Sequence, residues 1–490
     1  MKKRVLAFDL GASGGRAILA GYEDGKMKLQ EIHRFPNEPV YANGHLYWDV
    51  LRLLHEIKTG LRKANAAGGF DSVGIDTWGV DYGLLDKRGN LLCNPLHYRD
   101  DRTDDMLLEA EKYISMDTLY ALTGNEIMPI NTAFQLLEHK LNAPDLLEAS
   151  QCFLMMPDLL AYLLTGDISV ERTIAGTSQL LDIRTGGWSS ETIEALGLPE
   201  HIFPPLMETG ALKGMLSEDI CRELRIPSVP VIGVCGHDTQ CAAAAVPCPE
   251  DVPFLFISCG TWALFGTELN EPVVSEESAY FNLTNEVGYG DTVTFLKNIT
   301  GLWMIQETRR TLMAQGRSYS YADMEKMAAK ADPGLRFIDV EAPAFSDPGD
   351  MPARIRDWCS ESNQPAPADD ADVLRCIYES LACKFRSTME EIEQCTGQKY
   401  ERIYMLGGGV KDMLLCQLTA DLCGIPVLTG PVEATAYGNA AIQLIASGEI
   451  ENLHQARQSI ADSITVKEYT PNPENAYIYD NFQKIFRKES

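Results

Sequence analysis

The sequence predicts an α/β fold in two domains of similar plan, and three observations support it. The chain has 490 residues, and at about 150 residues per domain this length suggests two or three domains. Apolar strands, turns of small residues and helical patterns recur in both halves. Each half opens with the same strand–turn–strand pattern, first at the N-terminus and again near residue 252. We therefore expect an N-terminal domain over 1–244 and a C-terminal domain over 245–490.

The first half begins with a predicted antiparallel sheet, joined by turns at GASGG and EDGK. Its three strands are expected at 3–10, 16–22 and 27–35. A helix follows, because apolar residues recur every three or four positions from Trp48 to Leu61 before Gly68-Gly69 ends it. The stretch 70–86 is expected to return as a strand, with a hairpin turn at 87–90.

The middle of the chain, roughly 104–225, is expected to be mostly helical. It includes a short helix that starts at Pro157 and stops at Gly166, residues typical of a helix start and a helix end. A Pro- and Gly-rich segment, 331–352, predicts a surface excursion.

The second half repeats the opening with a strand–turn–strand over 252–269. Alternating apolar runs and glycine stops predict four later elements: a strand at 401–406, a helix at 411–423, a strand at 425–430 and a helix at 433–448.

The net charge and the composition indicate which kinds of molecule the protein can bind. The net charge is −28, while 45% of residues are apolar and 23% are charged, as in an ordinary globular protein. A surface this acidic repels nucleic acid and anionic membranes, so we expect neither as a partner. Small anionic ligands remain compatible with it, because backbone N–H groups, helix N-termini and a divalent cation can hold them locally.

The cysteines and the apolar runs predict a cytoplasmic protein. There are 13 cysteines, none in a C-x-x-C pair, and no spacing fits a zinc site. Cys359 and Cys376 could pair, but we favour two free thiols. The first apolar run is stopped by Asp9 after four residues, too soon for a secretory signal. The longest near-apolar run, 254–266, is too short to span a bilayer.

The first motif that carries chemistry is the run from Asp9 to Arg16. A strand ends in an acid, a turn of small residues follows, and a cation comes next. Small residues let backbone N–H groups approach a phosphate, and an acid suits Mg²⁺. The G-x-x-G-G spacing is neither a dinucleotide fingerprint nor a P-loop. An ordinary hairpin turn explains the run about equally well.

Two further glycine-containing turns favour a phosphate or nucleotide ligand. Ser258 to Trp262 repeats the strand-to-turn pattern and offers the hydroxyl of Thr261, although a β-turn beside a core Trp is an equal alternative. Gly407 to Gly409 follow a strand and precede a helix, where bare backbone can accommodate a flat ring. A tight strand-to-helix connection is the alternative there.

The carboxylate of Asp238 raises a different question. It is the one formal charge between Pro227 and Cys248, and apolar runs flank it. A buried carboxylate without a partner is costly, so it persists when it is paired, bound to a metal or used as a base. With an ordinary pKa of about 3.9, it is ionised at neutral pH and can accept a proton from a hydroxyl. Because TQCAAAA follows, it is also a candidate helix N-cap.

Two stretches with aromatic and polar residues complete the candidates. The run 74–81, GIDTWGVD, ends a predicted strand where open α/β sheets bind ligands, but a core role for Trp78 is the better explanation from this stretch alone. The run 297–303 with Gln306 reads locally as a helix start.

Taken together, these motifs resemble the FGGY family of carbohydrate kinases, within the actin, Hsp70 and sugar-kinase fold. The resemblance runs nearly end to end. It rests on FDLGASGGR, EIHRFPN, GHLYWDV, GIDTWGVDYGLLD, YRDDRT, LMMPDLLAYLLTG, GHDT, SCGTW, NITGLW, LGGGVKDMLLCQL and GPVEATAYGN. It implies two actin-like, ribonuclease H-like domains, with the sugar-binding insertions in 1–244, the nucleotide site in 245–490, and ATP and sugar in a cleft between them.

The resemblance also implies roles for individual residues. Asp238 is the expected catalytic base, and the expected ketose contacts are Trp78, Gly79, His237, Asp238, Thr239 and Asn298. The expected ATP contacts are Ala12, Ser13, Gly14, Gly15, Arg16, Thr261, Gln306 and Gly408. Asp9 is expected near Mg²⁺. The family often has Ser where this chain has Gly14 and Cys259, so one hydroxyl contact to phosphate is expected to be absent at each position.

The expected reaction is transfer of a phosphoryl group from ATP to the 1-hydroxyl of L-rhamnulose, by a monomer or small homo-oligomer. One alternative is a kinase of the same family for another ketose or polyol, such as L-fuculose or L-xylulose. A second is a non-enzymatic ATP-binding switch of the actin or Hsp70 kind.

Overall fold

A computed structural model describes residues 3–248 and 252–486. It divides the chain into two compact units, each described below by itself. Unit 1 takes in the described residues of Met1–Glu250 together with Glu268–Phe295 and Ala434–Ser463. Unit 2 takes in those of Asp251–Thr267 together with Leu296–Glu433 and Ile464–Ser490. Two stretches from the second half of the sequence therefore pack into unit 1.

The main sheet of unit 1 has the strand order β11-β12-β6-β1-β2-β3. β1 pairs antiparallel with β2 and parallel with β6, and β6 pairs parallel with β12. The outer pairs, β2 with β3 and β11 with β12, are antiparallel. The strands are β1 (Lys3–Gly11), β2 (Gly14–Glu23), β3 (Lys26–Pro36), β6 (Ser72–Thr77), β11 (Leu212–Met215) and β12 (Pro230–Ile232).

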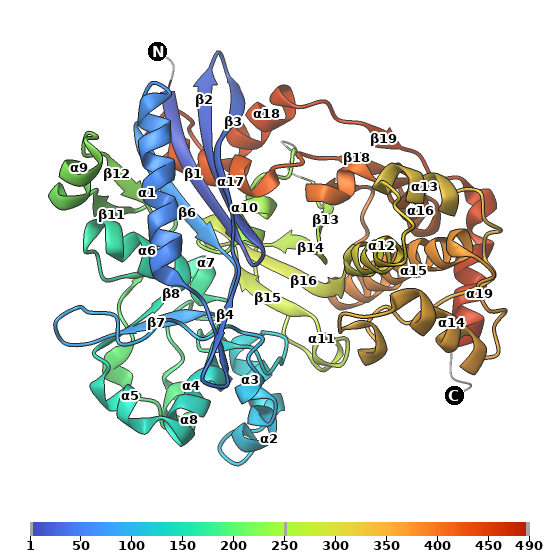
Figure 1. Cartoon of the computed structure of the whole chain (residues 1–490), viewed down its shortest axis with the longest axis horizontal. Helices are drawn as coiled ribbons and strands as arrows, with labels where there is room; N and C mark the ends of the chain where they lie inside the picture. The colour runs from blue at the N-terminus through green and yellow to red at the C-terminus, as the bar shows by residue number, and fades with distance from the viewer. Residues whose placement is uncertain (1–2, 249–251, 487–490) are drawn as a thin grey trace. The chain divides into compact units, whose positions relative to one another are not determined.

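Helices cover both faces of this sheet. α1 (Val50–Ala66) lies against the face that carries Phe8, and a Cβ atom at Gly60 would lie 2.6 Å from the Phe8 ring. α17 (Ala434–Ala446) packs on β1 and β6, beside α10 (Asp238–Ala244) (Figure 1). On that face, a Cβ atom at Gly74 would lie 2.5 Å from Asn439 Oδ1, so glycine is required for the close approach of the helix.

The remainder of unit 1 is built of short elements, many of them between residues 100 and 225. Three strand pairs are β4 (Val40–Ala42) with β5 (His45–Tyr47), β7 (Tyr82–Leu85) with β8 (Cys152–Met155), and β9 (Val170–Glu171) with β10 (Leu206–Met207). The other elements are α2 (Met106–Ala110), α3 (Met116–Thr123), α4 (Thr132–Asn142), α5 (Pro144–Ala149), α6 (Met156–Thr165), α7 (Arg172–Ala175), α8 (Ser190–Leu196), α9 (Glu218–Leu224), α11 (Glu276–Tyr280), β15 (Thr284–Val287) and α18 (Leu453–Ser463).

Most of a second sheet lies in unit 2, where its strands follow the order β16-β14-β13-β17-β18-β19. β13 pairs antiparallel with β14 and parallel with β17, β17 pairs parallel with β18, and β18 pairs antiparallel with β19. The strands are β13 (Leu255–Cys259), β14 (Trp262–Leu269), β16 (Val293–Thr300), β17 (Ile403–Leu406), β18 (Val427–Thr429) and β19 (Glu468–Tyr469). The helices are α12 (Trp303–Ala314), α13 (Tyr321–Ala328), α14 (Met351–Glu361), α15 (Asp370–Thr396), α16 (Met413–Cys423) and α19 (Tyr477–Phe486).

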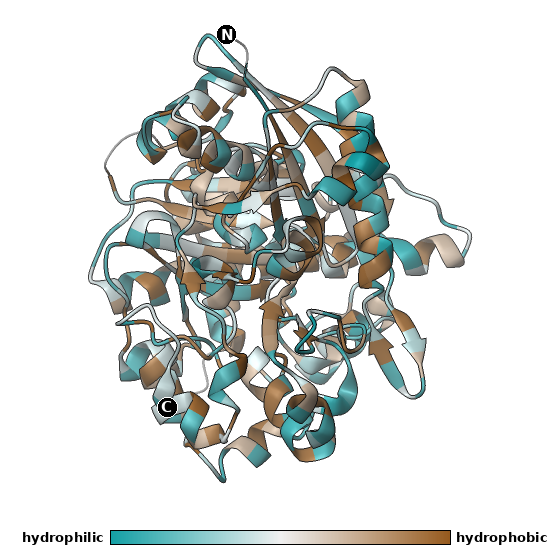
Figure 2. Ribbon diagram, turned by 90° about the vertical axis from the view of Figure 1, so that its left-hand side faces the viewer, coloured by the Kyte–Doolittle hydropathy of each residue, from teal (hydrophilic) through white to brown (hydrophobic). Residues whose placement is uncertain are grey.

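The expected two-domain α/β class is confirmed, and so are most expected elements. The helix expected after Pro157 is α6, which ends at Gly166 in the left-handed conformation. Many strands are brown in Figure 2, and the central strands β1, β6, β13 and β17 carry mainly buried side chains. All 13 cysteines are free thiols, including Cys359 and Cys376.

Three local expectations are wrong. The stretch 70–86 forms two strands, β6 and β7, because the chain turns at Val80, which has φ +66°. Lys297–Thr300 end the strand β16, and the helix α12 begins only at Trp303, after Gly301. The segment 331–352 is irregular as expected, but Phe337, Ile338 and Phe345 anchor it in the core.

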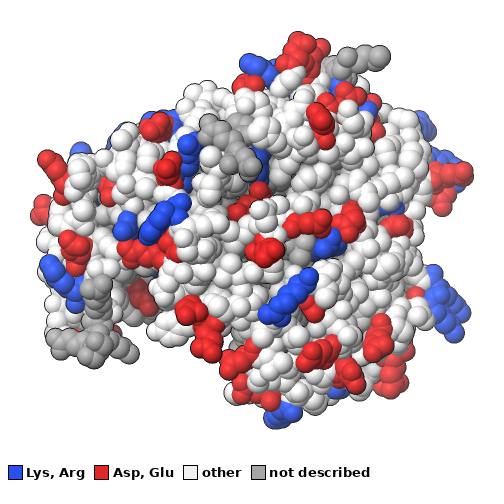
Figure 3. Space-filling view, turned by 180° about the vertical axis from the view of Figure 1, so that it is seen from behind, with Lys and Arg blue, Asp and Glu red and all other residues white. Residues whose placement is uncertain are grey.

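The surface carries charges of both signs. On the face drawn in Figure 3, acidic side chains predominate and basic ones are interspersed among them. In the described part of the chain, no helix is both long enough and apolar enough to cross a membrane.

Candidate functional site

The first predicted phosphate loop is the turn between β1 and β2 in unit 1. Ala12 and Ser13 form the turn, with Ser13 exposed, and Gly14 and Gly15 already belong to β2. A Cβ atom at Gly15 would lie 2.2 Å from the Phe35 ring, so glycine is needed there for packing. The side chain of Asn37, which the sequence analysis did not single out, holds the turn by donating to Gly11 O at 3.0 Å.

Asp9 and Arg16 are directly opposite each other in the β1–β2 ladder. The Arg16 guanidinium donates a hydrogen bond to the Asp9 carboxylate, which is 5% exposed. Two functional groups predicted from the sequence are thus brought together at the end of β1. The pair places a nearly buried carboxylate with its counterion immediately before the turn.

Asp76 is a buried acid within the candidate run 74–81, where the sequence pattern assigned it no individual role. It lies beside Asp9 in the parallel β1–β6 pairing and is 0% exposed. Its Oδ2 accepts a hydrogen bond from Asn439 Nδ2 at 2.6 Å, and within the described residues its Oδ1 has no hydrogen-bond partner. Burial, reinforced by the charge of Asp9, raises the pKa of Asp76 well above its ordinary value.

Asp238 occupies the first turn of α10. His237, and not Asp238, is the N-cap residue, so the expected N-cap role of Asp238 is wrong by one position. The segment is tied to the sheet because Thr77 N donates to Gly236 O at 2.9 Å. Asp238 Oδ1 accepts from Thr239 N at 2.7 Å. The apolar setting suggested full burial, but 32% of the Asp238 side chain is exposed.

The ionisation of Asp238 is set by opposing influences. Burial raises its pKa to about 6, while the neighbouring His237 opposes that rise and the charge of Asp9 adds to it. The His237 ring lies close, with Nε2 3.4 Å from Asp238 Oδ1. A partly open carboxylate with a pKa in this range can accept a proton near neutral pH.

His237 has a second acidic neighbour, Glu286 in β15. His237 Nδ1 is 3.1 Å from Glu286 Oε2, and Gln240 Nε2 donates to the same oxygen at 2.8 Å. Gln240 is held in turn by Thr294, whose hydroxyl donates to its Oε1 at 2.7 Å. The sequence gives little sign of this network, because Glu286 and Asp238 lie about 50 residues apart in an unremarkable strand and a helix.

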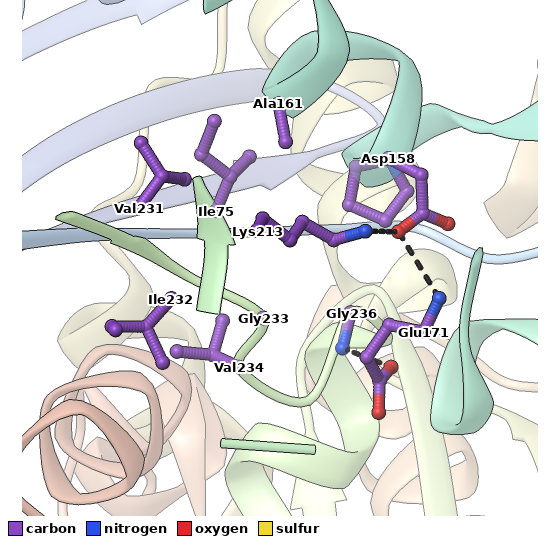
Figure 4. A pocket seen from close by; sticks show the side chains of 11 residues that line it. Ile75, Asp158, Ala161, Glu171, Lys213, Val231, Ile232, Gly233, Val234 and Gly236 are labelled. Atoms are coloured by element: carbon purple, nitrogen blue, oxygen red, sulfur yellow. Dashed lines mark hydrogen bonds and ion pairs between the residues drawn. The ribbon is translucent and has the colours of Figure 1, made fainter. Parts of the chain in front are cut away.

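Another buried carboxylate, Glu171, fixes the backbone just before His237. Glu171 Oε2 accepts from Gly236 N at 2.8 Å and from Thr173 N at 3.0 Å. Next to it, Lys213 Nζ lies 2.7 Å from Asp158 Oδ1 (Figure 4). The cavity lined by these residues has a volume of about 10 Å³, enough for one water molecule and too small for a sugar. We therefore interpret this cluster as structural: it holds the backbone that leads into His237 and Asp238 and does not bind the sugar.

Trp78 lies in an aromatic cluster. It is 6% exposed and its ring centroid is 4.1 Å from that of Trp48. Both indoles donate to Asp81 Oδ2, at 2.9 Å from Trp78 and 2.6 Å from Trp48. These contacts fit the core role that the sequence favoured for Trp78. Gly79 is only half-buried, and a Cβ atom there would lie 3.1 Å from the Thr177 side chain.

The second predicted phosphate loop lies in unit 2, between β13 and β14. Thr261 is exposed, and its Oγ1 donates to Gln306 Oε1 at 3.3 Å. Gly301 N donates to Thr261 O at 3.0 Å, and a Cβ atom at Gly301 would lie 2.6 Å from the Trp262 backbone. The structure thus brings two of the predicted ATP contacts together.

The triple glycine packs against this loop. Gly407 has φ +72°, and a Cβ atom at Gly409 would lie 2.6 Å from that of Cys259. Gly408 is exposed, so its backbone is open to a ligand, whereas Cys259 is 1% exposed. Asn298 is half-buried near the end of β16.

Two family models match the chain: the N-terminal domain of the FGGY family of carbohydrate kinases over residues 4–245, and its C-terminal domain over 255–447. Among curated proteins, a rhamnulokinase from Bacteroides thetaiotaomicron is 39% identical, with 99% of this chain and 100% of that protein covered. A rhamnulokinase from Enterococcus faecalis is 38% identical, with 100% and 98% covered.

Solved structures share the fold at lower identity. Ligand-bound xylulose kinase from Lactobacillus acidophilus matches with a TM-score of 0.82 at 17% identity, covering 99% of this chain and 96% of that one. Plasmodium falciparum glycerol kinase with ADP matches with a TM-score of 0.80 at 14% identity, covering 99% and 97%. The chain belongs to the FGGY family of carbohydrate kinases.

Proposed function

We propose that this chain phosphorylates L-rhamnulose at the 1-hydroxyl, with ATP as donor and L-rhamnulose 1-phosphate and ADP as products. The substrate is inferred from the curated rhamnulokinases, which align over nearly the whole chain. The observation that carries the chemistry is Asp238, a partly exposed carboxylate held at the start of α10 within an otherwise buried segment.

Asp238 acts as the general base. Its Oδ1 is already engaged by Thr239 N and faces His237, so Oδ2 is the oxygen that we assign to the sugar hydroxyl. As the 1-oxygen bonds to the γ-phosphorus, the hydroxyl proton moves to Asp238 and the bond to the β–γ bridging oxygen breaks, releasing ADP. Because phosphoryl transfer depends mainly on alignment and charge neutralisation, a fixed base is the main protein group needed on the acceptor side.

We assign ketose binding mainly to residues of unit 1. The contacts are Gly79, His237 and Thr239, with Asn298 contributed by β16. We also assign Trp78 to the ketose site. Because its indole N–H already donates to Asp81, its role there would be to contact the sugar with its ring and not to form a hydrogen bond. The narrow space at Gly79 favours a sugar lying against bare backbone.

ATP is assigned to three turns. The turn Ala12–Arg16 supplies backbone donors and the Arg16 cation for phosphate. Thr261 and Gln306, which are hydrogen-bonded to each other, and the exposed backbone of Gly408 supply the contacts from 245–490, which we propose as the nucleotide-carrying domain. The sugar-binding domain is proposed as 1–244.

The residues near Asp9 fit Mg²⁺ held mainly by nucleotide. Within the described ranges, no cluster of three or more His, Cys, Asp or Glu side chains is arranged to hold a metal alone. Mg²⁺ is usually bound by one or two carboxylates together with substrate phosphates and waters. Asp9 lies beside Asp76, whose Oδ1 has no hydrogen-bond partner among the described residues, and together they provide that donor set. When bound, the ion would neutralise phosphate charge during transfer.

A substrate panel tests the proposal. ADP release would be measured by a coupled assay with L-rhamnulose, L-fuculose, L-xylulose, D-xylulose and no sugar. We expect kcat/KM for L-rhamnulose to exceed the others by about tenfold or more, the scale on which a fitted site discriminates related substrates. A higher value for another ketose would reassign the substrate, and sugar-independent ADP release would favour a nucleotide-driven switch.

A further inference from the structure

The His237 imidazole lies between two carboxylates. Nδ1 is 3.1 Å from Glu286 Oε2, and Nε2 is 3.4 Å from Asp238 Oδ1. The His237 and Glu286 side chains are only 10% and 8% exposed, so water offers the ring few alternative partners. The ring is therefore positioned by the acids on its two sides.

An ionised carboxylate can only accept a hydrogen bond, so a nitrogen that faces one needs a proton. Each of the two carboxylate oxygens that face the ring already accepts another hydrogen bond. Glu286 Oε2 also accepts from Gln240 Nε2 at 2.8 Å, and Asp238 Oδ1 also accepts from Thr239 N at 2.7 Å. A neutral imidazole with its proton on Nδ1, in the hydrogen bond to Glu286, would turn the lone pair of Nε2 toward the Asp238 carboxylate 3.4 Å away, whereas an imidazolium presents a positive charge to both acids.

We propose that His237 is a doubly protonated imidazolium, and that Glu286 is the positioning residue that keeps this charge beside the catalytic base. This inference rests on the proposed function of Asp238 as the base. The imidazolium charge, 3.4 Å from Asp238 Oδ1, favours the ionised carboxylate against its burial, and Oδ2 is left to receive the proton of the sugar hydroxyl.

The charges that face this pair agree with the assignment. His237 is faced by Glu286 from β15, Asp238 from α10 and Glu171 from β9. Burial alone lowers the pKa of His237, but these carboxylates, with Glu286 first among them, raise it above its ordinary value. Asp238 is faced by Asp9 and Glu286, which raise its pKa, and by His237, which lowers it. Removing Glu286 would therefore weaken the favourable positive charge that His237 presents to Asp238.

The variant Glu286→Gln separates charge from structure. A Gln amide oxygen in the Oε2 position keeps both hydrogen bonds, from His237 and Gln240, and loses only the charge. We expect kcat to fall by about tenfold or more, a fraction of what general base catalysis contributes. We expect KM for the ketose to change by less than about threefold, because binding contacts are retained. Losing the Glu286 charge lowers the pKa of Asp238, but losing the imidazolium charge raises it by more, so the acid limb of the kcat/KM profile should move to higher pH.

Thr294→Val is the matched control. It removes the hydroxyl that holds Gln240 in the same buried network, one residue further from His237. It should lower the melting temperature while leaving the pH profile in place. Equal pH profiles for the wild type and Glu286→Gln, with similar kcat, would overturn the proposal and leave Glu286 a purely structural residue.

A spectroscopic readout keeps the inference independent of the substrate assignment. The chain has 8 histidines, so ¹⁵N-imidazole labelling is tractable, and His237→Gln identifies the His237 signals. At pH 7.5 we expect both His237 nitrogens to carry a proton in the wild type and only one in Glu286→Gln. A neutral His237 in the wild-type protein would overturn the proposal, even if the enzyme proves to act on a different sugar.

Discussion

The two sheets share one strand plan, and one row of side chains shows most clearly how their chemistry differs. The strand order in unit 1, β3-β2-β1-β6-β12-β11, corresponds to the order β16-β14-β13-β17-β18-β19 in the second sheet. From β2 to β11, and likewise from β14 to β19, successive strand pairs are antiparallel, parallel, parallel and antiparallel. The third pair before the turn is Asp9 with Arg16 in unit 1, and Asp76 adjoins Asp9 on the parallel side.

The same row in unit 2 is entirely apolar. Ile257 pairs with Phe265 across the antiparallel ladder and with Met405 on the parallel side. All three are 0% exposed. Burying carboxylates is unfavourable, whereas burying these apolar side chains stabilises the fold. The comparison suggests that the row in unit 1 is kept for the proposed chemistry, whereas the row in unit 2 forms core beneath the loop that we propose for the nucleotide.

The largest expected effect, on the free energy of unfolding, comes from placing a carboxylate in the apolar row of unit 2. Ile257→Asp would bury a carboxylate with no cation opposite, so we expect a loss of stability of more than about 4 kcal/mol, the range of severe core defects. Urea denaturation measures it. Ile257→Val is the control and should cost about 0.5–1.5 kcal/mol. Comparable stability of the two variants would show that this row is not a closed core.

Removing the carboxylate from the row in unit 1 should lower activity more than stability. Asp9→Asn removes the charge that faces Arg16, and we expect kcat to fall by about a hundredfold or more, because charge placement dominates phosphoryl transfer. Coupled ADP assays across a range of Mg²⁺ concentrations check this, and a thermal melt within a few degrees of wild type confirms folding. An active Asp9→Asn enzyme with wild-type Mg²⁺ dependence would break the comparison.

The raised pKa of Asp76 can be tested through the pH dependence of the melting temperature. Its raised pKa means that the folded protein binds this proton more tightly than the unfolded chain does. Its contribution to stability is therefore largest at low pH and is lost as the pH rises from near its ordinary value of 3.8 through the raised one. Asp76→Asn removes this loss, so the melting-temperature difference, variant minus wild type, should grow between pH 4.5 and pH 8. Parallel curves would argue against a raised pKa.

The smallest effect is expected at Cys259. Its side chain is buried against Gly409 and not directed to solvent, so restoring the family's frequent Ser should add no phosphate contact. For Cys259→Ser we expect KM for ATP to stay within about twofold and stability to fall by about 1 kcal/mol, from burial of a hydroxyl. A clear gain in ATP affinity would show that this side chain reaches the nucleotide.

Much of the fold was predictable because its signals are local. The repeated strand–turn–strand pattern, the glycine stops at Gly166 and Gly424, and the helix after Pro157 all follow from short-range periodicity and backbone preference. The break at Val80 was not predictable, because a Val with positive φ is held there by tertiary contacts such as Thr177 Oγ1 with Val80 N at 3.0 Å. The strand at Lys297–Thr300 was hidden for a similar reason, since sheet pairing and not local propensity decides it.

The site was predictable where chemistry coincides with an unusual local pattern. Asp9 ends a strand at a small-residue turn, and Asp238 is a lone charge in an apolar run. Glu286 has no such signature, and the run 74–81 that contains Asp76 does not show which of its residues matters. The importance of Glu286 and Asp76 comes from contacts with His237 and Asn439, which lie 49 and 363 positions away along the chain. Only the folded chain brings these partners together.

The most direct test of the central claim is ADP release by Asp238→Asn with L-rhamnulose, alongside ATP binding by calorimetry. Asn keeps the size of the side chain and cannot act as the base. We predict that turnover falls by about 10²–10⁴-fold while the Kd for ATP stays close to that of the wild type. Near-normal turnover in this variant would contradict the account.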